Sequence, residues 1–197
     1  MSKFYAVRKG KTNGIFFSWD DCKAQVEGYK GAEYKSFKTL SEAEAYVSGS
    51  KKTDTEYTDV LCAYVDGSFD ASSGKYGSGV VYVLNDEVIE TQKKCSDHPD
   101  IVAMRNVAGE ITASVMAMRY AVANNYNRIV IFHDYEGIAK WCRGEWKTEK
   151  EGTRLYKFFY DSVKPKLDVS FVKVDAHTGV KYNEMADKLA KESLGIQ

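Results

Sequence analysis

The sequence predicts an α/β fold with a mixed sheet, preceded by a small α+β module. Beyond residue 59, β-branched and aromatic runs alternate with amphipathic segments of helical period, as in α/β proteins. The stretch 48–58 is polar, charged and aperiodic, which is typical of a linker. Of the 197 residues, 44% are hydrophobic and 13% aromatic, enough for packed cores. We therefore expect domains at 1–47 and 59–197, joined by the linker 48–58.

The first 47 residues predict two strands, a helix, a third strand and a second short helix. The runs "FYAVRKG" and "GIFFS" flank the turn "KTN", which predicts a hairpin. The run "SWDDCKAQVEG" predicts a helix, because Ser18 can cap it, two aspartates follow in its first turn and Gly28 ends it. After it, "AEYKSF" resembles a strand and "SEAEAYV" a short helix.

The sequence of the larger domain predicts three strands, a helix, a strand, two helices, a strand and a last helix, in that order. The turn "ND" joins its second and third strands as a hairpin. Strands alternate with helices only after that hairpin, so we expect parallel and antiparallel pairs in one sheet. The expected segments are 59–66, 77–84, 87–95, 107–124, 128–133, 136–142, 149–163, 167–174 and 182–193.

Composition narrows the function classes. The 28 basic residues balance the 28 acidic ones, so a surface for a polyanion requires local segregation of charge. The cysteines are far apart and form no CxxC pair, which indicates buried free thiols and a reducing compartment. No apolar run is long enough for a signal peptide or a membrane span. We expect a cytoplasmic monomer that does not bind membranes.

Two strands of the larger domain end in an aspartate, Asp66 after "LCAYV" and Asp134 after "RIVIFH". Ligands of open α/β sheets bind at strand ends near a switch in strand order, so these acids are expected to be neighbours. Glu110 lies in the first turns of the long helix, on a stripe of small residues that packs on a sheet. Asp187 lies four residues after Asn183, on the same face of the last helix.

Several carboxylates without an obvious nucleophile predict a metal-dependent nuclease. Acids held close together ionise only if cations neutralise them, and oxygen-only clusters select Mg²⁺ or Mn²⁺. Each acid alone has a simpler interpretation: Asp66 as a turn residue, Glu110 and Asp134 as solvated charges at helix starts, with Asp134 as an N-cap, and Asp187 as a surface acid. Their joint occurrence, in this order on these elements, favours the site.

With these acids in place, residues 58–195 resemble ribonuclease H of type 1. The motifs are "YVDGS", "GE" in a long helix, "HD" after an apolar strand, and "AHTGVKYNEMADKLA". The resemblance implies an RNase H-like mixed five-stranded sheet flanked by helices. It implies a four-carboxylate site at Asp66, Glu110, Asp134 and Asp187. It also implies that His177 is the family's mobile histidine, which assists proton movement or product departure.

The same resemblance implies endonucleolytic hydrolysis of the RNA strand of RNA–DNA hybrids, with 5′-phosphate and 3′-hydroxyl products. Two Mg²⁺ ions are the implied cofactors, with Mn²⁺ as a substitute: Asp66 bridges them, Glu110 and Asp134 hold one, and Asp187 holds the other. Glu110 also touches a ribose 2′-OH, the group that distinguishes RNA from DNA. The further substrate contacts that we expect in this domain are Ser68, Asn106 and Asn183.

The first 47 residues look like the small hybrid-binding domain that precedes the catalytic domain in many such enzymes. The resemblance assigns Trp19 and Tyr34 to the duplex backbone and Lys35 to a phosphate, whereas core packing is the simpler interpretation of the two aromatics. Residues 1–40 hold eight Lys or Arg against four Asp or Glu, which suits nonspecific phosphate binding. We expect this module to bind RNA–DNA hybrid, with double-stranded RNA as a further ligand.

The sequence departs from the family pattern near two of the acids. Val107 stands where relatives often have a second polar amide, so minor-groove contact there is expected to be reduced. Tyr135 and Glu136 replace the commoner Ser-Gln, whereas Trp146 and Lys147 keep the context of the family's basic handle. Two alternatives stay open: a catalytically weak or inactive binder of hybrid or double-stranded RNA on the same scaffold, and a DNA-cutting nuclease of resolvase or transposase type.

Overall fold

The computed structural model describes residues 3–37, 43, 46–47, 57–174 and 181–196. The chain divides into two compact units, Met1–Glu56 and Tyr57–Gln197, and each is described by itself. Of the predicted linker, residues 48–56 lie outside the described residues, and so does most of the predicted helix 41–47.

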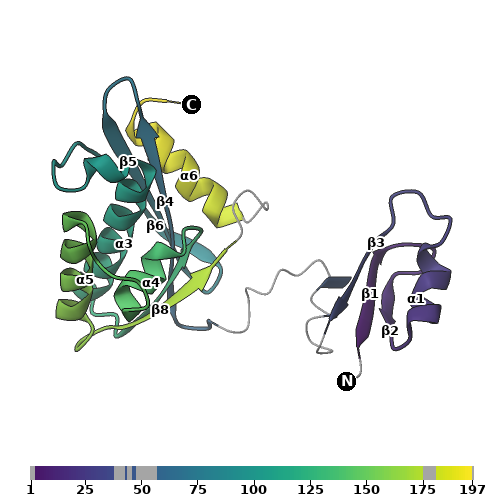
Figure 1. The fold of residues 1–197 in the computed structure, drawn as a ribbon. Coiled ribbons are helices and arrows are strands. Elements are labelled where there is room, and N and C mark those ends of the chain that lie inside the picture. The colour runs from purple at the N-terminus through teal and green to yellow at the C-terminus, as the bar shows by residue number, and fades with distance from the viewer. Residues whose placement is uncertain (1–2, 38–42, 44–45, 48–56, 175–180, 197) are drawn as a thin grey trace. The chain divides into compact units, whose positions relative to one another are not determined.

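The first unit is a three-stranded antiparallel sheet with one helix packed on it (Figure 1). Its strands are β1 (Phe4–Lys9), β2 (Gly14–Phe16) and β3 (Glu33–Phe37), in the order β2-β1-β3. The helix α1 (Trp19–Val26) begins as expected, because the Ser18 side chain accepts a hydrogen bond from the Asp21 N–H at 3.1 Å. Buried Val7, Cys22 and Val26 form the core between helix and sheet.

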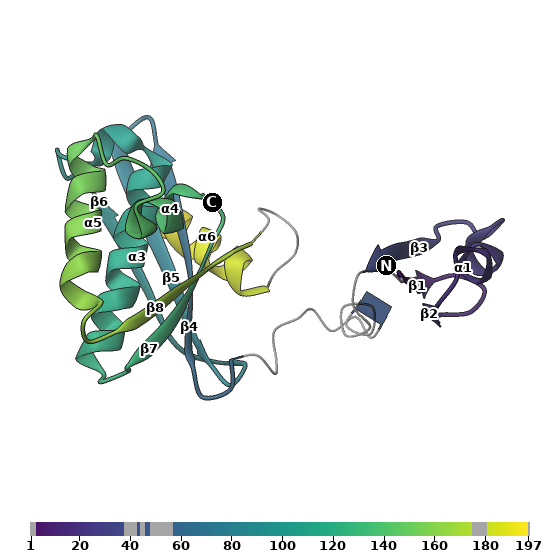
Figure 2. The same ribbon diagram turned by 60° about the horizontal axis from the view of Figure 1, so that its bottom comes forward.

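The second unit is a five-stranded mixed sheet with helices on both faces (Figures 1 and 2). This confirms the predicted fold class. The strand order is β6-β5-β4-β7-β8; the pairs β4–β7 and β7–β8 are parallel, and the other two are antiparallel. The elements are β4 (Leu61–Asp70), β5 (Lys75–Leu84), β6 (Glu87–Ser96), η1 (Val102–Met104), α3 (Asn106–Ala123), β7 (Arg128–His133), α4 (Gly137–Arg143), α5 (Glu151–Val163), β8 (Asp168–Lys173) and α6 (Lys181–Ser193).

Strand alternation divides the core of this unit into two layers. On one face Leu61, Ala63 and Val65 of β4 pack against α3, α4 and α5. On the other face Cys62 and Tyr64 pack against α6. The sheet therefore separates α3 from α6 (Figure 2). Any site that uses side chains of both helices must form where both helices contact the same strands. Within the described ranges, no helix combines the length and the apolar character that a membrane crossing requires.

The strand that carries Asp66 is longer than the sequence suggested. We expected it to end at Asp66, with Gly67 and Ser68 turning the backbone away, but β4 continues to Asp70 and Asp66 pairs with Gly79 in mid-strand. The turn interpretation of Asp66 was therefore wrong. The hairpin turn comes later, where the Asp70 carboxylate accepts hydrogen bonds from the Ser72 and Ser73 backbone N–H groups.

Gly67 is needed for close packing. A Cβ atom on residue 67 would lie 2.1 Å from the Asn106 carbonyl oxygen and 2.4 Å from the Glu110 nitrogen, so only glycine lets the start of α3 lie directly on β4. Gly109 makes the reciprocal approach, since a Cβ atom there would lie 2.1 Å from the Gly77 carbonyl oxygen. The Ser78 hydroxyl closes this contact by donating to the Gly109 carbonyl at 2.8 Å. The backbone of α3 is thereby fixed on the sheet one residue before Glu110.

Candidate active site

Asp66 lies on the central strand, beside the end of β7. The parallel register pairs Tyr64 with Phe132, and two further residues along each strand bring Asp66 level with Asp134. The Asp66 carboxylate accepts a hydrogen bond from the Gly67 N–H at 2.7 Å, which orients it without neutralising it. Adjacent parallel strands thus supply two acids at one level of the sheet.

Glu110 comes from α3 and is almost fully enclosed, with 4% of its surface exposed. Its carboxylate accepts a hydrogen bond from the Tyr135 backbone N–H at 3.2 Å. Among the described residues no cation pairs with Glu110, although a buried charge without a partner is costly. The interpretation of Glu110 as a solvated charge at a helix start was therefore wrong.

The segment from His133 to Tyr135 holds Glu110 in place. The buried His133 ring places Nδ1 3.0 Å from the Tyr135 carbonyl, and burial lowers the pKa of His133 to about 4. The neutral imidazole can therefore donate Nδ1–H to that carbonyl while the Tyr135 N–H donates to Glu110. Asp134 itself is not the N-cap of α4, a position that Glu136 occupies. The capping interpretation of Asp134 was wrong, and its carboxylate instead lies beside Glu110, whose pKa it raises.

Asp187 and Asn183 come from α6, on the opposite face of the sheet from α3. The Asp187 carboxylate accepts a hydrogen bond from Lys191 at 2.7 Å, so this acid already has a cation. Asn183 is buried, and in the described part of the chain its Oδ1 accepts no hydrogen bond. A buried amide oxygen without a donor is unusual and marks Asn183 as a candidate ligand contact.

The four acids form one electrostatic group. Burial raises the pKa of Asp66 to about 7, and Asp134 and Asp187 add to this by repulsion, while Lys191 opposes it. Burial also raises the pKa of Glu110 well above its ordinary value, followed by repulsion from Asp134 and, more weakly, from Asp66. At neutral pH the nearby positive charge does not balance the negative charge of these acids. A bound cation reduces their mutual repulsion.

This acid set fits a divalent cation by its donor chemistry, since oxygen-only sites suit Mg²⁺ and Mn²⁺. In the ranges that the structure describes, no group of three or more His, Cys, Asp or Glu side chains is already arranged to hold a metal ion. Mg²⁺ does not require such a cage, because it is usually held by one or two carboxylates together with waters and substrate phosphates.

We expect Glu110→Gln to stabilise the metal-free protein at alkaline pH. The raised pKa of Glu110 means that folding favours its protonated form, and this contribution to stability is lost as pH rises through the folded-state pKa. In EDTA, the melting temperature of the variant should match that of the wild type near pH 5 and exceed it by about 3 °C or more at pH 8.

Glu136→Gln is the matched control, because Lys140 and Lys173 lower the pKa of this exposed acid. Its loss should slightly destabilise the protein at pH 8, the opposite sign. If Glu110→Gln gave no gain at pH 8, the raised pKa inferred for Glu110 would be wrong.

A pocket of about 380 Å³ lies at the starts of α3 and α5, and we call it the helix-start pocket. Predicted residue Asn106 lines it, as do Trp146, Lys147 and Tyr135. Sequence reasoning missed Arg105 and Lys150, the N-cap residues of the two helices. Neither helix has a side-chain N-cap hydrogen bond, so backbone N–H groups and three cations, opposed by the one acid Glu149 among the lining residues, make this pocket suitable for a phosphate.

Arg105 could not have been found from its sequence context. It adopts a φ of 56°, a conformation that normally favours glycine, and its guanidinium lies 5.9 Å from the centre of the Phe69 ring. A large residue held in a strained backbone conformation is a pointer to function. Ser68, the remaining predicted contact in this unit, pairs with Gly77 in the β4–β5 ladder and is half-buried. His177 lies outside the described residues.

In the first unit the structure brings Trp19 and Tyr34 together. Their ring centres are 5.9 Å apart, the Tyr5 ring also lies 5.7 Å from Trp19, and the two predicted residues are 43% and 46% exposed. The core-packing interpretation of this pair is therefore wrong. Lys35 is the next residue of β3 and lies over the Phe37 ring, so strand alternation puts it on the other face from Tyr34.

Comparison with known proteins gives two family matches that together span most of the chain. Residues 3–47 match the family described as Ribonuclease H1 N-terminal domain, and residues 58–194 match the family described as RNase H. Ribonuclease H1 of Homo sapiens is 27% identical over 252 residues, an alignment that covers 96% of this chain and 88% of the human protein. Ribonuclease H1 of Rattus norvegicus is 26% identical, with 98% and 89% covered.

Solved structures show the same fold. The crystal structure of RNase H1 from Halobacterium salinarum NRC-1 aligns with a TM-score of 0.59 at 24% identity, covering 68% of this chain and 97% of that one. LC11-RNase H1 in complex with RNA/DNA hybrid aligns with a TM-score of 0.52 at 15% identity, covering 68% of this chain and 99% of that one.

Proposed function

Because this chain belongs to the ribonuclease H family, we propose that its four interacting acids hold divalent metal ions for the hydrolysis of RNA–DNA hybrids. The family and the named relatives make it an endoribonuclease that hydrolyses the RNA strand of such hybrids. The observation that carries the proposal is the convergence of Asp66, Glu110 and Asp134 in a place where their own charges repel.

We assign Asp66 to both of two Mg²⁺ ions, Glu110 and Asp134 to one, and Asp187 to the other, with Mn²⁺ as a substitute. When bound, such an ion pair supplies an activated water and stabilises the leaving oxygen of a phosphodiester. The protein itself orients the carboxylates that hold the ions. The Gly67 N–H fixes Asp66, and the Tyr135 N–H fixes Glu110, beside the expected position of a ribose 2′-OH.

The products proposed are a 5′-phosphate and a 3′-hydroxyl, and His177 is proposed to assist proton movement or product departure. The ion pair between Lys191 and Asp187 is expected to weaken when a metal ion binds. A carboxylate that coordinates an ion interacts less strongly with a lysine. Asn183, whose buried Oδ1 accepts no hydrogen bond from the described residues, is proposed as a substrate contact on the same helix.

The helix-start pocket is proposed to hold a backbone phosphate of the substrate. Arg105, Lys147 and Lys150 supply positive charge there. Asn106 supplies a single amide, because Val107 stands where relatives often have a second one. Contacts to phosphates and 2′-OH groups carry little sequence information, so weak sequence preference is expected.

The proposed function is tested by comparing three labelled duplexes of one sequence: RNA–DNA hybrid, DNA duplex and double-stranded RNA. With Mg²⁺ we expect cleavage of the RNA strand of the hybrid only, no cleavage in EDTA, and recovery with Mn²⁺. Binding of hybrid without cleavage in either metal would contradict the enzyme and favour a binding protein on this scaffold. Cleavage of the DNA duplex would instead indicate a different nuclease.

The first unit is proposed to hold hybrid, and double-stranded RNA more weakly, through the Trp19–Tyr34 pair on one face of its sheet and through a phosphate contact of Lys35 on the other face. We expect Trp19→Ala and Lys35→Ala each to weaken hybrid affinity and to lower the number of cuts per encounter, while single cleavage events persist. Processivity on a long end-labelled hybrid, with trapping of released enzyme, measures this.

Tyr29→Ala is the matched control, because Tyr29 is a 43% exposed aromatic of the same unit outside the Trp19–Tyr34 pair. Unchanged affinity in both the Trp19 and the Lys35 variants would contradict the assignment. Equal losses in the Tyr29 variant would mean that exposed aromatics of this unit contribute without a defined site.

A further inference from the structure

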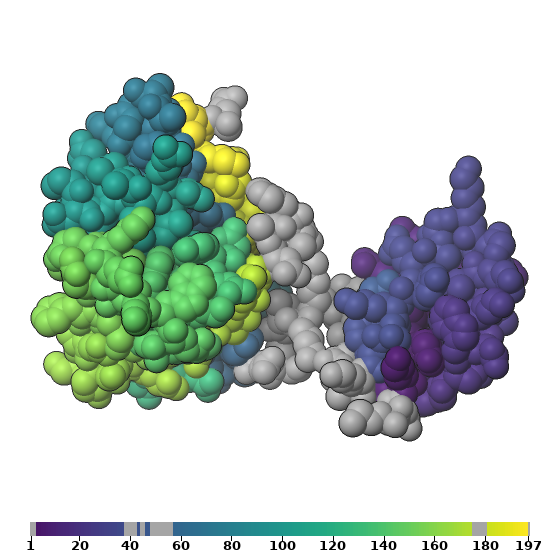
Figure 3. Space-filling view, viewed as in Figure 1, coloured from purple at the N-terminus to yellow at the C-terminus, as the bar shows by residue number. Residues whose placement is uncertain are grey.

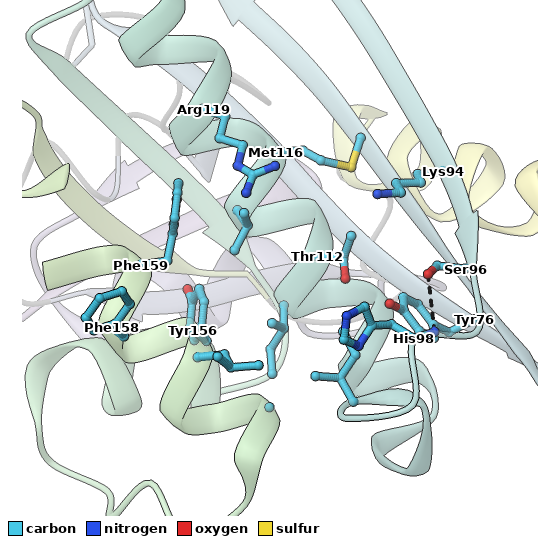
Figure 4. Close-up of a pocket in the computed structure, with 15 residues that line it drawn as sticks. Tyr76, Lys94, Ser96, His98, Thr112, Met116, Arg119, Tyr156, Phe158 and Phe159 are labelled. Atoms are coloured by element: carbon cyan, nitrogen blue, oxygen red, sulfur yellow. Dashed lines mark hydrogen bonds between the residues drawn. The ribbon is translucent and has the colours of Figure 1, made fainter. Parts of the chain in front are cut away.

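A second pocket of about 360 Å³, which we call the α3–α5 pocket, lies apart from the acids. Figure 4 shows its arrangement: Thr112 and Met116 of α3 lie between Phe158 and Phe159 of α5 on one side and Lys94, Ser96 and His98 on the other, with Arg119 of α3 at one end. Its lining residues are Tyr76, Lys94, Ser96, His98, Ile101, Ile111, Thr112, Val115, Met116, Arg119, Gly152, Leu155, Tyr156, Phe158 and Phe159.

The interior of this pocket is apolar, and its apolar surface continues outward. Phe158 is 74% exposed and Leu155 is 43% exposed, both on α5. Figure 3 shows the α5 region (green) at the surface, against the region that contains η1 and the start of α3 (teal). A large aromatic side chain that is exposed beside a cavity indicates a partner-binding surface more often than an isolated exposed residue does.

The Lys, Arg, Asp and Glu side chains that line the pocket have one sign, although Asp100 lies just outside it, 3.8 Å from Nδ1 of the lining His98. No Asp or Glu is among its lining residues, whereas Lys94 and Arg119 are exposed cations at its edge. Within the described part of the chain, neither of them forms an ion pair, although neighbouring Lys93 pairs with Glu192 and Lys157 pairs with Asp161. Arg119 instead lies 5.2 Å from the centre of the Phe159 ring, so its charge is held at the mouth of the cavity.

We propose that the α3–α5 pocket binds a short acidic segment of a partner protein, which inserts an aromatic or long aliphatic side chain. The inserted side chain lies among Met116, Leu155 and Phe159, and flanking carboxylates pair with Lys94 and Arg119. Nucleic acid is a poorer fit, because single strands need aromatic faces along a continuous basic groove, and among the lining residues only Lys94 and Arg119 are Lys or Arg. The proposal does not depend on the catalytic assignment.

The test is selection of a phage-displayed random dodecapeptide library on the full-length protein, followed by affinity measurement of synthetic peptides. We expect enriched peptides that combine Asp or Glu with Phe, Trp, Leu or Ile. Their affinity should fall about tenfold or more in a Lys94→Glu/Arg119→Glu double variant and in Phe158→Ser, and it should weaken as salt is raised.

Lys166→Glu is the matched control, since Lys166 is exposed, outside the pocket and without an ion pair among the described residues. Cleavage of hybrid should be unchanged in all variants, which reports correct folding. The proposal is overturned by enriched peptides without acids, by peptides that bind the pocket variants as well as the wild type, or by no enrichment at all. It is also overturned if vesicles of anionic lipid, or a second copy of the chain by sedimentation, bind the wild type and lose that binding in the pocket variants.

Discussion

Asp66→Asn is expected to reduce cleavage of RNA–DNA hybrid by about a thousandfold or more, while hybrid affinity changes little. Asp66 is the acid that interacts with both Asp134 and Asp187, so its charge is shared by both proposed ion positions. Asparagine keeps the size and can still accept from the Gly67 N–H, but it removes the charge. A thousandfold loss corresponds to about 4 kcal/mol of transition-state stabilisation, a typical cost of removing a central electrostatic group.

Single-turnover cleavage of an end-labelled hybrid and a separate binding measurement in EDTA give the two quantities. Asp70→Asn is the control on the same strand, because the Asp70 carboxylate is engaged by Ser72 and Ser73 in the hairpin turn. That variant should retain full cleavage. An Asp66→Asn protein with activity within tenfold of the wild type would rule out a central role for this carboxylate.

Gly67→Ala is expected to cost about 3 kcal/mol or more in the free energy of unfolding and to abolish most of the activity. The added methyl group would lie 2.1 Å from the Asn106 carbonyl oxygen and 2.4 Å from the Glu110 nitrogen, and backbone atoms cannot move aside as side chains can. Helix α3 must shift off β4, and Glu110 must move with it.

Urea unfolding of the wild type and the variant measures this cost. The control is Gly74→Ala, where a Cβ meets nothing within 4 Å and only the φ of +68° opposes alanine, at about 1 kcal/mol. Equal losses in the two variants would show that backbone conformation, and not the approach of α3, makes Gly67 necessary.

Much of the fold could be predicted from the sequence, because it is encoded locally. The turn "ND" is confirmed by positive φ angles at Asn85 and Asp86, and the apolar run of β7 ends at His133 as expected. The mixed sheet also follows from the order of elements. Hydrophobic period, turn residues and helix punctuation act over a few residues, and they are readable without knowledge of tertiary contacts.

The rest depends on contacts between distant segments. The run "VDGS" looks like the end of a strand until α3 is seen packed on Gly67. The hydrogen bond from the Tyr135 N–H to Glu110 involves a backbone atom, which no residue type reveals. The conformation of Arg105 is likewise a product of tertiary structure. The four acids were located from strand ends and helix faces, and their catalytic roles, which the resemblance implies, stay predictions.

The placement of Glu110 and Asp187 on helices from opposite faces of the sheet has a consequence for biosynthesis. Asp66 is made early in the second unit, whereas Asp187 is made near its end, after every strand of the sheet. A nascent or truncated chain that lacks α6 therefore lacks part of the site. Cleavage of RNA–DNA hybrid is therefore expected only from chains in which α6 has been made and has docked on the sheet.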